Sequence, residues 1–159
     1  MIFSSSNKLL AVADGHVISL NEISGDGQDD MSEIPPGSGG FAVEPVSGTI
    51  YSPVSGRIES VADSGQSYSI RADDGLDLLV RIGNEKIDLG GKGFISLVEQ
   101  GDVVRAGDVI AKADISLLKL KGYSVTTPVL ITNHDELREF DVRLGWVRGG
   151  RSAVATYKK

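Results

Sequence analysis

The sequence predicts an all-β fold, a sandwich or barrel of strands joined by many tight turns. Glycine is abundant, with 20 residues among 159, and it falls between short runs rich in β-branched residues. Such runs, bounded by turn residues, are typical of β-strands. A short internal repeat points the same way, because the segment 45–50 (Pro-Val-Ser-Gly-Thr-Ile) recurs at 53–58 with a single change. Each copy is expected to be a turn whose glycine frees the backbone before a new strand begins.

Ten runs are expected to form strands, because each combines β-branched or other apolar residues with flanking turn residues. In chain order they are Leu9–Ala13, His16–Leu20, Gly48–Tyr51, Gly56–Ala62, Ser67–Ala72, Leu76–Ile82, Lys86–Leu89, Val109–Ala113, Thr127–Ile131 and Ala153–Tyr157. In the run at 76–82, every even-numbered residue is Leu, Val or Ile and is expected in the core. The odd-numbered Asp77, Leu79 and Arg81 are then expected on the opposite face.

Helix signals are weak and short. Phe94–Glu99 is expected to form one or two turns, and a second short helix is expected over 114–119 with Asp114 as its N-cap. Between about 24 and 40, the chain is rich in Gly, Asp, Ser and Pro and has no hydrophobic period. We interpret that segment as a long, mobile surface loop inside a single domain that covers 1–159.

Composition limits the classes of function. A chain of 159 residues with 40% hydrophobic residues can bury a core without disulfides, and it has no cysteine for a thiolate metal site or nucleophile. The net charge of -6 argues against general nucleic-acid binding, which needs a basic face. The polar N-terminus does not fit a signal peptide, and no run approaches the roughly 18 apolar residues of a membrane span. We expect a cytoplasmic protein that does not insert into a membrane.

Five segments carry a recognisable order of motifs. They are Ser52–Ile58 (SPVSGRI), Gly75–Gly83 (GLDLLVRIG), Leu89–Phe94 (LGGKGF), Gly101–Ile110 (GDVVRAGDVI) and Thr127–Asn133 (TPVLITN). In this order they resemble the glucose-type IIA family of the bacterial sugar phosphotransferase system, over a stretch from about Ala11 to near the C-terminus. The resemblance implies an antiparallel β-sandwich of the duplicated hybrid motif kind, with short helices at its edge.

The resemblance also implies a particular chemistry. In that family, a histidine within the second motif accepts a phosphoryl group from the histidine-containing phosphocarrier protein and passes it to a IIB domain. A second histidine, 15 positions earlier, stabilises the transferred group. Here the acceptor position is Arg81 and the supporting position is Gln66. Arginine stays protonated and offers no lone pair, and the glutamine amide is not a nucleophile, although it can donate a hydrogen bond.

Phosphotransfer of the family type is therefore expected to be absent, with no catalytic residue at these two positions. The chain has only two histidines, His16 and His134, and neither falls on a family position. Both are expected to be partly exposed to solvent. The alternative is a phosphocarrier of sugar uptake that uses one of them as a relocated acceptor.

A partner-binding face is expected around the two substituted positions. Leu79 and Ile87 resemble part of the family's docking patch, and Met31 is an apolar remnant of another docking segment. Two roles are considered for Arg81. Its guanidinium binds an anion or a phosphorylated partner, or it forms a surface ion pair with Asp77 or Glu85. The residues assigned to this face are Met31, Ser64, Gln66, Leu79, Arg81, Glu85 and Ile87.

Two other classes are weaker. A lysostaphin-type metallopeptidase has a related sandwich, but its metal site needs histidines and an aspartate at fixed places, so no metal is expected. A lipoyl or biotinyl carrier needs a lysine at a hairpin tip, and the nearest match, Ala111-Lys112-Ala113, lies inside an expected strand. We expect a regulatory or scaffolding pseudoenzyme without cofactor. Its partners would be the phosphocarrier protein, a IIB domain, transporters or metabolic enzymes.

Overall fold

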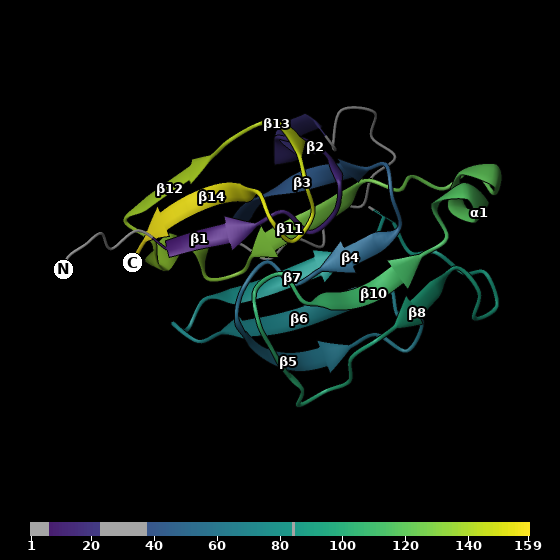
Figure 1. The fold of residues 1–159 in the computed structure, drawn as a ribbon, viewed down its shortest axis with the longest axis horizontal. Helices are drawn as coiled ribbons and strands as arrows, with labels where there is room; N and C mark the ends of the chain where they lie inside the picture. The colour runs from purple at the N-terminus through teal and green to yellow at the C-terminus, as the bar shows by residue number, and fades with distance from the viewer. Residues whose placement is uncertain (1–6, 23–37, 84) are drawn as a thin grey trace.

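The computed structural model describes residues 7–22, 38–83 and 85–159, which form three antiparallel sheets (Figure 1). The largest sheet has eight strands, and it carries Leu79 and Arg81. Its strands in spatial order are β13 (Gly145–Val147), β2 (Gly15–Ile18), β3 (Gly39–Pro45), β11 (Thr127–Ile131), β7 (Asp77–Arg81), β6 (Ser67–Ala72), β5 (Gly56–Val61) and β9 (Val103–Val104).

Two three-stranded sheets complete the structure. One consists of β1 (Asn7–Leu10), β14 (Ala153–Lys158) and β12 (Glu139–Val142), and the other of β4 (Thr49–Tyr51), β10 (Val109–Ala113) and β8 (Phe94–Ser96). In Figure 1, β4 and β10 lie in front of β6 and β7, with the core between the layers. The expected antiparallel β-sandwich is confirmed, and each sheet in the described part of the chain has two ends, so no barrel closes.

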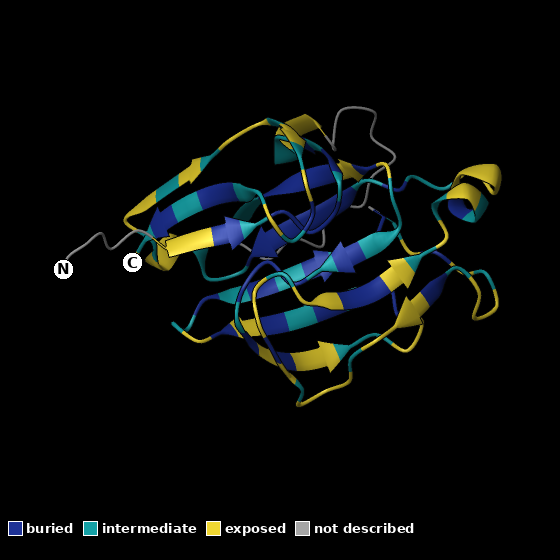
Figure 2. Cartoon of the chain, viewed as in Figure 1, coloured by how far each residue is buried: buried dark blue, intermediate teal, exposed yellow. Residues whose placement is uncertain are grey.

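Alternation along the strands places the core. Leu76, Leu78, Val80 and Ile82 are at most 2% exposed, whereas the side chains between them are half-buried, as expected from the pattern. Figure 2 shows the same alternation of buried and more exposed residues along the neighbouring strands. Complete burial of a Leu, Val or Ile side chain contributes about 1.5–3 kcal/mol, so this face fixes the register of β7.

One of the two expected helices forms. α1 covers Ile115–Leu120, and the carboxylate of Asp114 caps it by accepting a hydrogen bond from the Leu117 amide at 3.0 Å. The helix expected at Phe94–Glu99 is wrong, because Phe94–Ser96 is strand β8 and pairs with β10. Phe94 is buried there, and its position opposite Ala113 outweighs a weak local helix preference.

Strand predictions fail in two further ways. Lys86–Leu89 is irregular, because its backbone is held by a side chain instead of by a neighbouring strand. β3 was not expected, and it begins inside the stretch assigned to the 24–40 loop. Gly40 explains the error: a Cβ there would meet the Val129 carbonyl oxygen at 2.0 Å, so a strand that packs this closely must carry a residue typical of loops. The rest of that loop, with Met31, lies outside the described residues.

Short edge strands account for the remaining misses. β9, β12 and β13 have two to four residues each, so their pattern is too brief to separate from loop. The other nine expected strands all overlap observed ones.

Candidate functional site

Gln66 and Arg81 lie side by side at one end of the β6–β7 hairpin. The two strands pair antiparallel with Ser67 opposite Arg81, and the Ile82 amide donates to the Gln66 carbonyl oxygen at 2.8 Å. The structure thus brings together the two positions that the sequence motifs assigned to one site. It does so because the hairpin turn, with Gly75 at φ 94°, reverses the chain midway between them.

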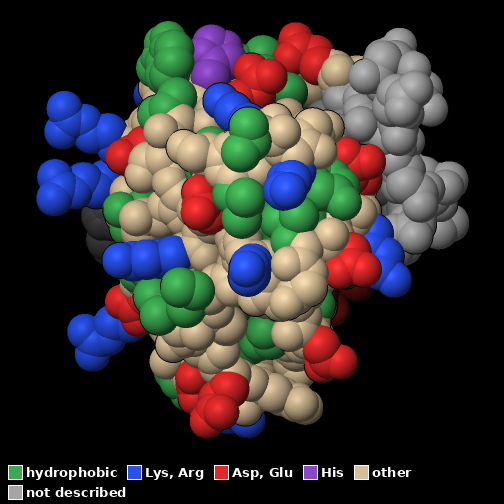
Figure 3. Space-filling model, turned by 90° about the vertical axis from the view of Figure 1, so that its right-hand side faces the viewer, with side chains coloured by type: hydrophobic (Ala, Val, Ile, Leu, Met, Phe, Trp, Pro, Cys, Tyr) green, Lys and Arg blue, Asp and Glu red, His purple; other side chains and the backbone are tan. Residues whose placement is uncertain are grey.

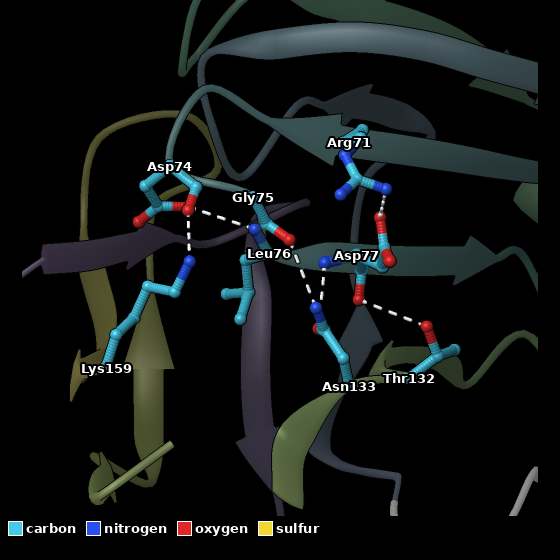
Figure 4. Close-up of polar contacts among 8 residues, drawn as sticks. All are labelled: Arg71, Asp74, Gly75, Leu76, Asp77, Thr132, Asn133 and Lys159. Atoms are coloured by element: carbon cyan, nitrogen blue, oxygen red, sulfur yellow. Dashed lines mark hydrogen bonds and ion pairs between the residues drawn. The ribbon is translucent and has the colours of Figure 1, made fainter. Parts of the chain in front are cut away.

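The far end of this hairpin is anchored by Asn133 (Figure 4). The Asn133 side-chain oxygen accepts from the Asp77 amide at 2.9 Å, and its amide nitrogen donates to the Gly75 carbonyl oxygen at 3.1 Å. The Thr132 amide donates to the Asp77 carbonyl oxygen at 2.9 Å. Asn133 is the last residue of the TPVLITN motif, so the sequence singled it out as part of a motif. Its role in positioning β7 against β11 was not predicted.

The Gln66 side chain is buried and clamps the segment after β7. It is 6% exposed, and its amide nitrogen donates to the carbonyl oxygens of Ile82 at 3.1 Å and Glu85 at 2.5 Å. Its side-chain oxygen accepts from the Ile87 amide at 3.2 Å. A glutamine amide has two hydrogens, and both are directed at these carbonyls. The sequence alone allows the Gln66 amide to donate to a ligand, but in the structure it donates to these two backbone carbonyls instead.

Gly83 makes this tight segment possible. Its φ is 86°, and a Cβ there would meet Ile87 Cδ1 at 2.8 Å and the Ser124 carbonyl oxygen at 3.0 Å. A side chain is excluded both by the left-handed backbone and by contact with backbone atoms. Two features therefore fix the backbone at Ile82, Glu85 and Ile87. One is the set of hydrogen bonds from Gln66, and the other is the turn at Gly83, which only glycine can adopt.

Arg81 is half-buried at the end of β7, and its Nε donates to the Gly83 carbonyl oxygen at 3.2 Å. Asp77, one of the two acids considered as its partner, forms an ion pair with Arg71 at 3.2 Å. A protonated guanidinium at this position offers donors but no lone pair. The position of Arg81 therefore provides hydrogen-bond donors and no nucleophile.

The other residues assigned to the docking face divide by burial. Leu79 and Glu85 are half-buried and Ser64 is exposed, so each presents some surface. Ile87 is 4% exposed and belongs to the core, so the expectation that its side chain faces a partner is wrong. It turns inward because Gln66 holds its amide and Gly83 leaves room for its side chain. Gln66 is buried as well, so it supports the face without forming part of it.

A buried phenol supports the turn before Gln66. Tyr68 is fully buried, and its hydroxyl donates to the Gly65 carbonyl oxygen at 2.9 Å. Burial raises the pKa of the Tyr68 phenol, so the proton that makes this bond is retained at neutral pH. In the part of the chain that the structure describes, no group of three or more His, Cys, Asp or Glu is placed to hold a metal ion.

Neither histidine lies at the site. His16 is on β2, three strand spacings from β7 or about 14 Å, and its ring packs edge-to-face with Trp146 at 5.3 Å. His134 begins the 3₁₀ turn η3 (His134–Glu136), where it packs against Phe140 at 4.9 Å. β11 runs antiparallel to β7, so His134 lies toward the Asp77 end of β7 and away from Arg81.

Comparison with known proteins decides the family. Residues 7–137 match the family described as phosphoenolpyruvate-dependent sugar phosphotransferase system, EIIA 1. The chain belongs to this family. Within it, the chain is a glucose-type IIA domain, since it is 34% identical to the glucose-specific EIIA component of Haemophilus influenzae over 76% of its own length and 72% of that protein.

Two further similar proteins support the same family assignment. This IIA domain is 33% identical, over 94% of its length, to part of the glucose-specific EIICBA component of Streptococcus pneumoniae, of which it spans 20%. Its structure is similar to that of glucose permease IIA from Mycoplasma capricolum, with a TM-score of 0.85, 29% identity and 98% of each chain covered. Among the helices of the described residues, none has the length and apolar character needed to cross a bilayer.

Proposed function

We propose that this glucose-type IIA protein carries no phosphate at the family's two histidine positions and acts as a regulatory or scaffolding binding protein. The observation that carries the proposal is the pair Gln66 and Arg81, which the hairpin places together where the resemblance assigns the acceptor and its support. The family's fold is retained around a site whose side chains have a different chemistry.

The acceptor position has lost its nucleophile. Transfer from a phosphohistidine needs an attacking lone pair, which a neutral imidazole supplies near pH 7. The guanidinium of Arg81 offers only N–H donors and no lone pair, so it cannot make this attack. Phosphorylation at this position is therefore not expected at any useful rate.

At the supporting position, the side-chain amide of Gln66 has no N–H group left to donate to a phosphoryl group. Both side-chain amide hydrogens of Gln66 are directed at the carbonyl oxygens of Ile82 and Glu85. To donate to a phosphoryl group, the amide would have to leave one of these carbonyls unpaired, at about 1–3 kcal/mol. Gln66 thus holds the backbone beneath the proposed docking surface and does not contact a transferred phosphoryl group.

Partners are proposed to dock on the surface formed by Leu79, Arg81, Glu85 and Ser64. The relative from Streptococcus pneumoniae, named an EIICBA component, joins its IIA part to other components in one chain. A IIB domain and the phosphocarrier protein are therefore the first candidate partners, with transporters or metabolic enzymes as further ones. Binding would not depend on a phosphorylation state of this chain, and we propose that it takes place in the cytoplasm.

A labelling experiment tests the loss of phosphotransfer. The purified protein is incubated with phosphoenolpyruvate and the two general phosphotransferase proteins, and its intact mass is measured alongside a histidine-containing IIA protein. No 80 Da adduct (the mass of one added HPO₃ group) is expected here. Stoichiometric acid-labile phosphate would refute the proposal, and its loss in His16→Ala or His134→Ala would assign a relocated acceptor.

A binding experiment tests the docking face. Leu79→Asp is compared with Leu120→Asp, which introduces the same charge at an exposed leucine of α1 that is 80% accessible. The affinity for purified IIB domain or phosphocarrier protein should fall at least tenfold in Leu79→Asp and by less than twofold in the control. Equal affinities for the two variants would show that partners do not dock around Leu79.

A further inference from the structure

β13 is an end strand of the eight-stranded sheet and lies at the upper edge of the molecule in Figure 1. Among the described strands its one neighbour is β2, with Trp146 opposite His16. An end strand presents the backbone N–H and C=O groups of its outer side to any chain that lies alongside. β13 is four strand spacings from β7, about 19 Å, so it is separate from the surface around Arg81.

This edge has apolar side chains where sheet edges are commonly protected by lysine, proline or inward-pointing charge. Trp146 is 73% exposed and Leu144 is 56% exposed. Between them is Gly145, and no atom of the described residues lies within 4 Å of the place that its Cβ would take. An open glycine in a strand leaves room for another backbone to approach closely. The opposite end strand, β9, also exposes an apolar side chain, Val103 at 75%, but it has only two residues and is flanked by one acid and one base, Asp102 and Arg105.

A groove of about 550 Å³ lies on one face beside this edge. Trp146, His16 and Glu44 form one row across β13, β2 and β3, and Val46 and Lys119 also contribute to its lining. Figure 3 views the end of the molecule that carries α1, where Lys and Arg side chains stand among hydrophobic ones. A large apolar side chain that reaches Trp146 from an added strand would meet the mouth of this groove.

The C-terminal segment that includes β13 has a charge opposite in sign to that of the whole chain. The net charge is -6, yet residues 142–159 contain no Asp or Glu. Their basic residues are Arg143, Arg148, Arg151, Lys158 and Lys159. Arg143 and Arg148 are exposed and flank β13, one at each end.

We propose that β13 binds an extended peptide segment of a partner protein, with an apolar centre and acidic ends, as an added strand of the sheet. Backbone hydrogen bonds along β13 would supply affinity, Trp146 would contact the apolar centre, and Arg143 and Arg148 would pair with the acidic ends. Charge argues against a second copy of this chain as the occupant. Antiparallel pairing of two β13 strands would bring Arg143 of each copy to the same end of the ladder as Arg148 of the other, where like charges repel.

A peptide titration tests this proposal. The probe is the capped peptide Glu-Glu-Val-Thr-Phe-Thr-Val-Thr-Glu-Glu, and the reference is the same peptide with lysine in place of each glutamate. Trp146 is the only tryptophan, so its emission on excitation at about 295 nm, where the probe's phenylalanine does not absorb, reports on this edge alone. We expect a saturable change with the acidic probe at 50 mM salt that weakens at least tenfold at 500 mM salt.

Variants make the test specific. Arg143→Glu with Arg148→Glu should weaken binding of the acidic probe at least tenfold and should bind the lysine peptide instead. Arg57→Glu with Arg105→Glu makes the same charge change near β9 and should alter affinity less than twofold. Circular dichroism confirms that each variant is folded.

The proposal is overturned by any of three results. These are no saturable change up to about 1 mM probe, affinity that persists in the Arg143 and Arg148 variant, or a self-association through β13 that the probe does not displace. None of these results depends on whether the protein accepts phosphate, so the proposal stands or falls separately from the proposed function.

Discussion

The clamp formed by Gln66 can be tested by replacing it with leucine, a side chain of similar size without polar atoms. The change leaves the carbonyl oxygens of Ile82 and Glu85 and the amide of Ile87 without their present partner. An unsatisfied buried group costs about 1–3 kcal/mol, and the bond to the Glu85 carbonyl is only partly buried, so its loss lies at the low end of that range. We therefore expect the free energy of unfolding to fall by about 3 kcal/mol, close to a loss of 6–12 °C in Tm for a chain of this size.

Urea and thermal unfolding followed by circular dichroism measure this loss, and hydrogen exchange should show faster exchange of the Ile87 amide. Gln100→Leu is the matched control, because it makes the same chemical change at an exposed residue and should alter stability by less than about 0.5 kcal/mol. Gln66→His should fall between the two, since an imidazole has two ring nitrogens for three backbone groups. If Gln66→Leu is as stable as Gln100→Leu, the segment is not held by this side chain and the reasoning is refuted.

Three other perturbations follow from the same geometry. Gly83→Ala should destabilise the fold by about 2 kcal/mol more than Gly91→Ala, because both have φ 86° but only Gly83 has atoms where the Cβ would lie; equal melting temperatures would contradict this. Asn133→Ala should cost about 1–3 kcal/mol and speed amide exchange at the β6–β7 turn, which mass spectrometry of exchanged peptides can locate. Burial, with the nearby Asp74, raises the pKa of Tyr157 above its ordinary value of 10.0, so its contribution to stability is complete below about pH 10 and is lost above it. Urea unfolding from pH 8 to 11 should show that decline, and Tyr157→Phe should make it shallower, leaving the part due to the buried Tyr68 phenol, whose pKa is raised as well.

The sequence was informative about features that depend on local pattern or on the identity of one side chain. Alternation along 76–82 assigned the buried face of β7 correctly, and Asp114 was recognised as a helix cap. It was less informative where tertiary packing overrides composition. Gly39 and Gly40 look like loop residues in isolation, yet they begin β3. A side chain on Gly40 would meet the Val129 carbonyl oxygen of β11, and one on Gly39 would meet the ring of His134.

The site divides in the same way. That residue 81 is an arginine, with no lone pair to accept a phosphoryl group, is a property of the side chain itself and was determined by the sequence alone. That Gln66 has no hydrogen left to donate was decided only by the tertiary structure, because its three partners lie 16 to 21 positions away along the chain. The burial of Ile87 and the place of β13 at one end of the described eight-stranded sheet were decided there too. A residue's chemistry belongs to its own atoms, whereas its hydrogen-bond partners and its exposure depend on how the rest of the chain closes around it.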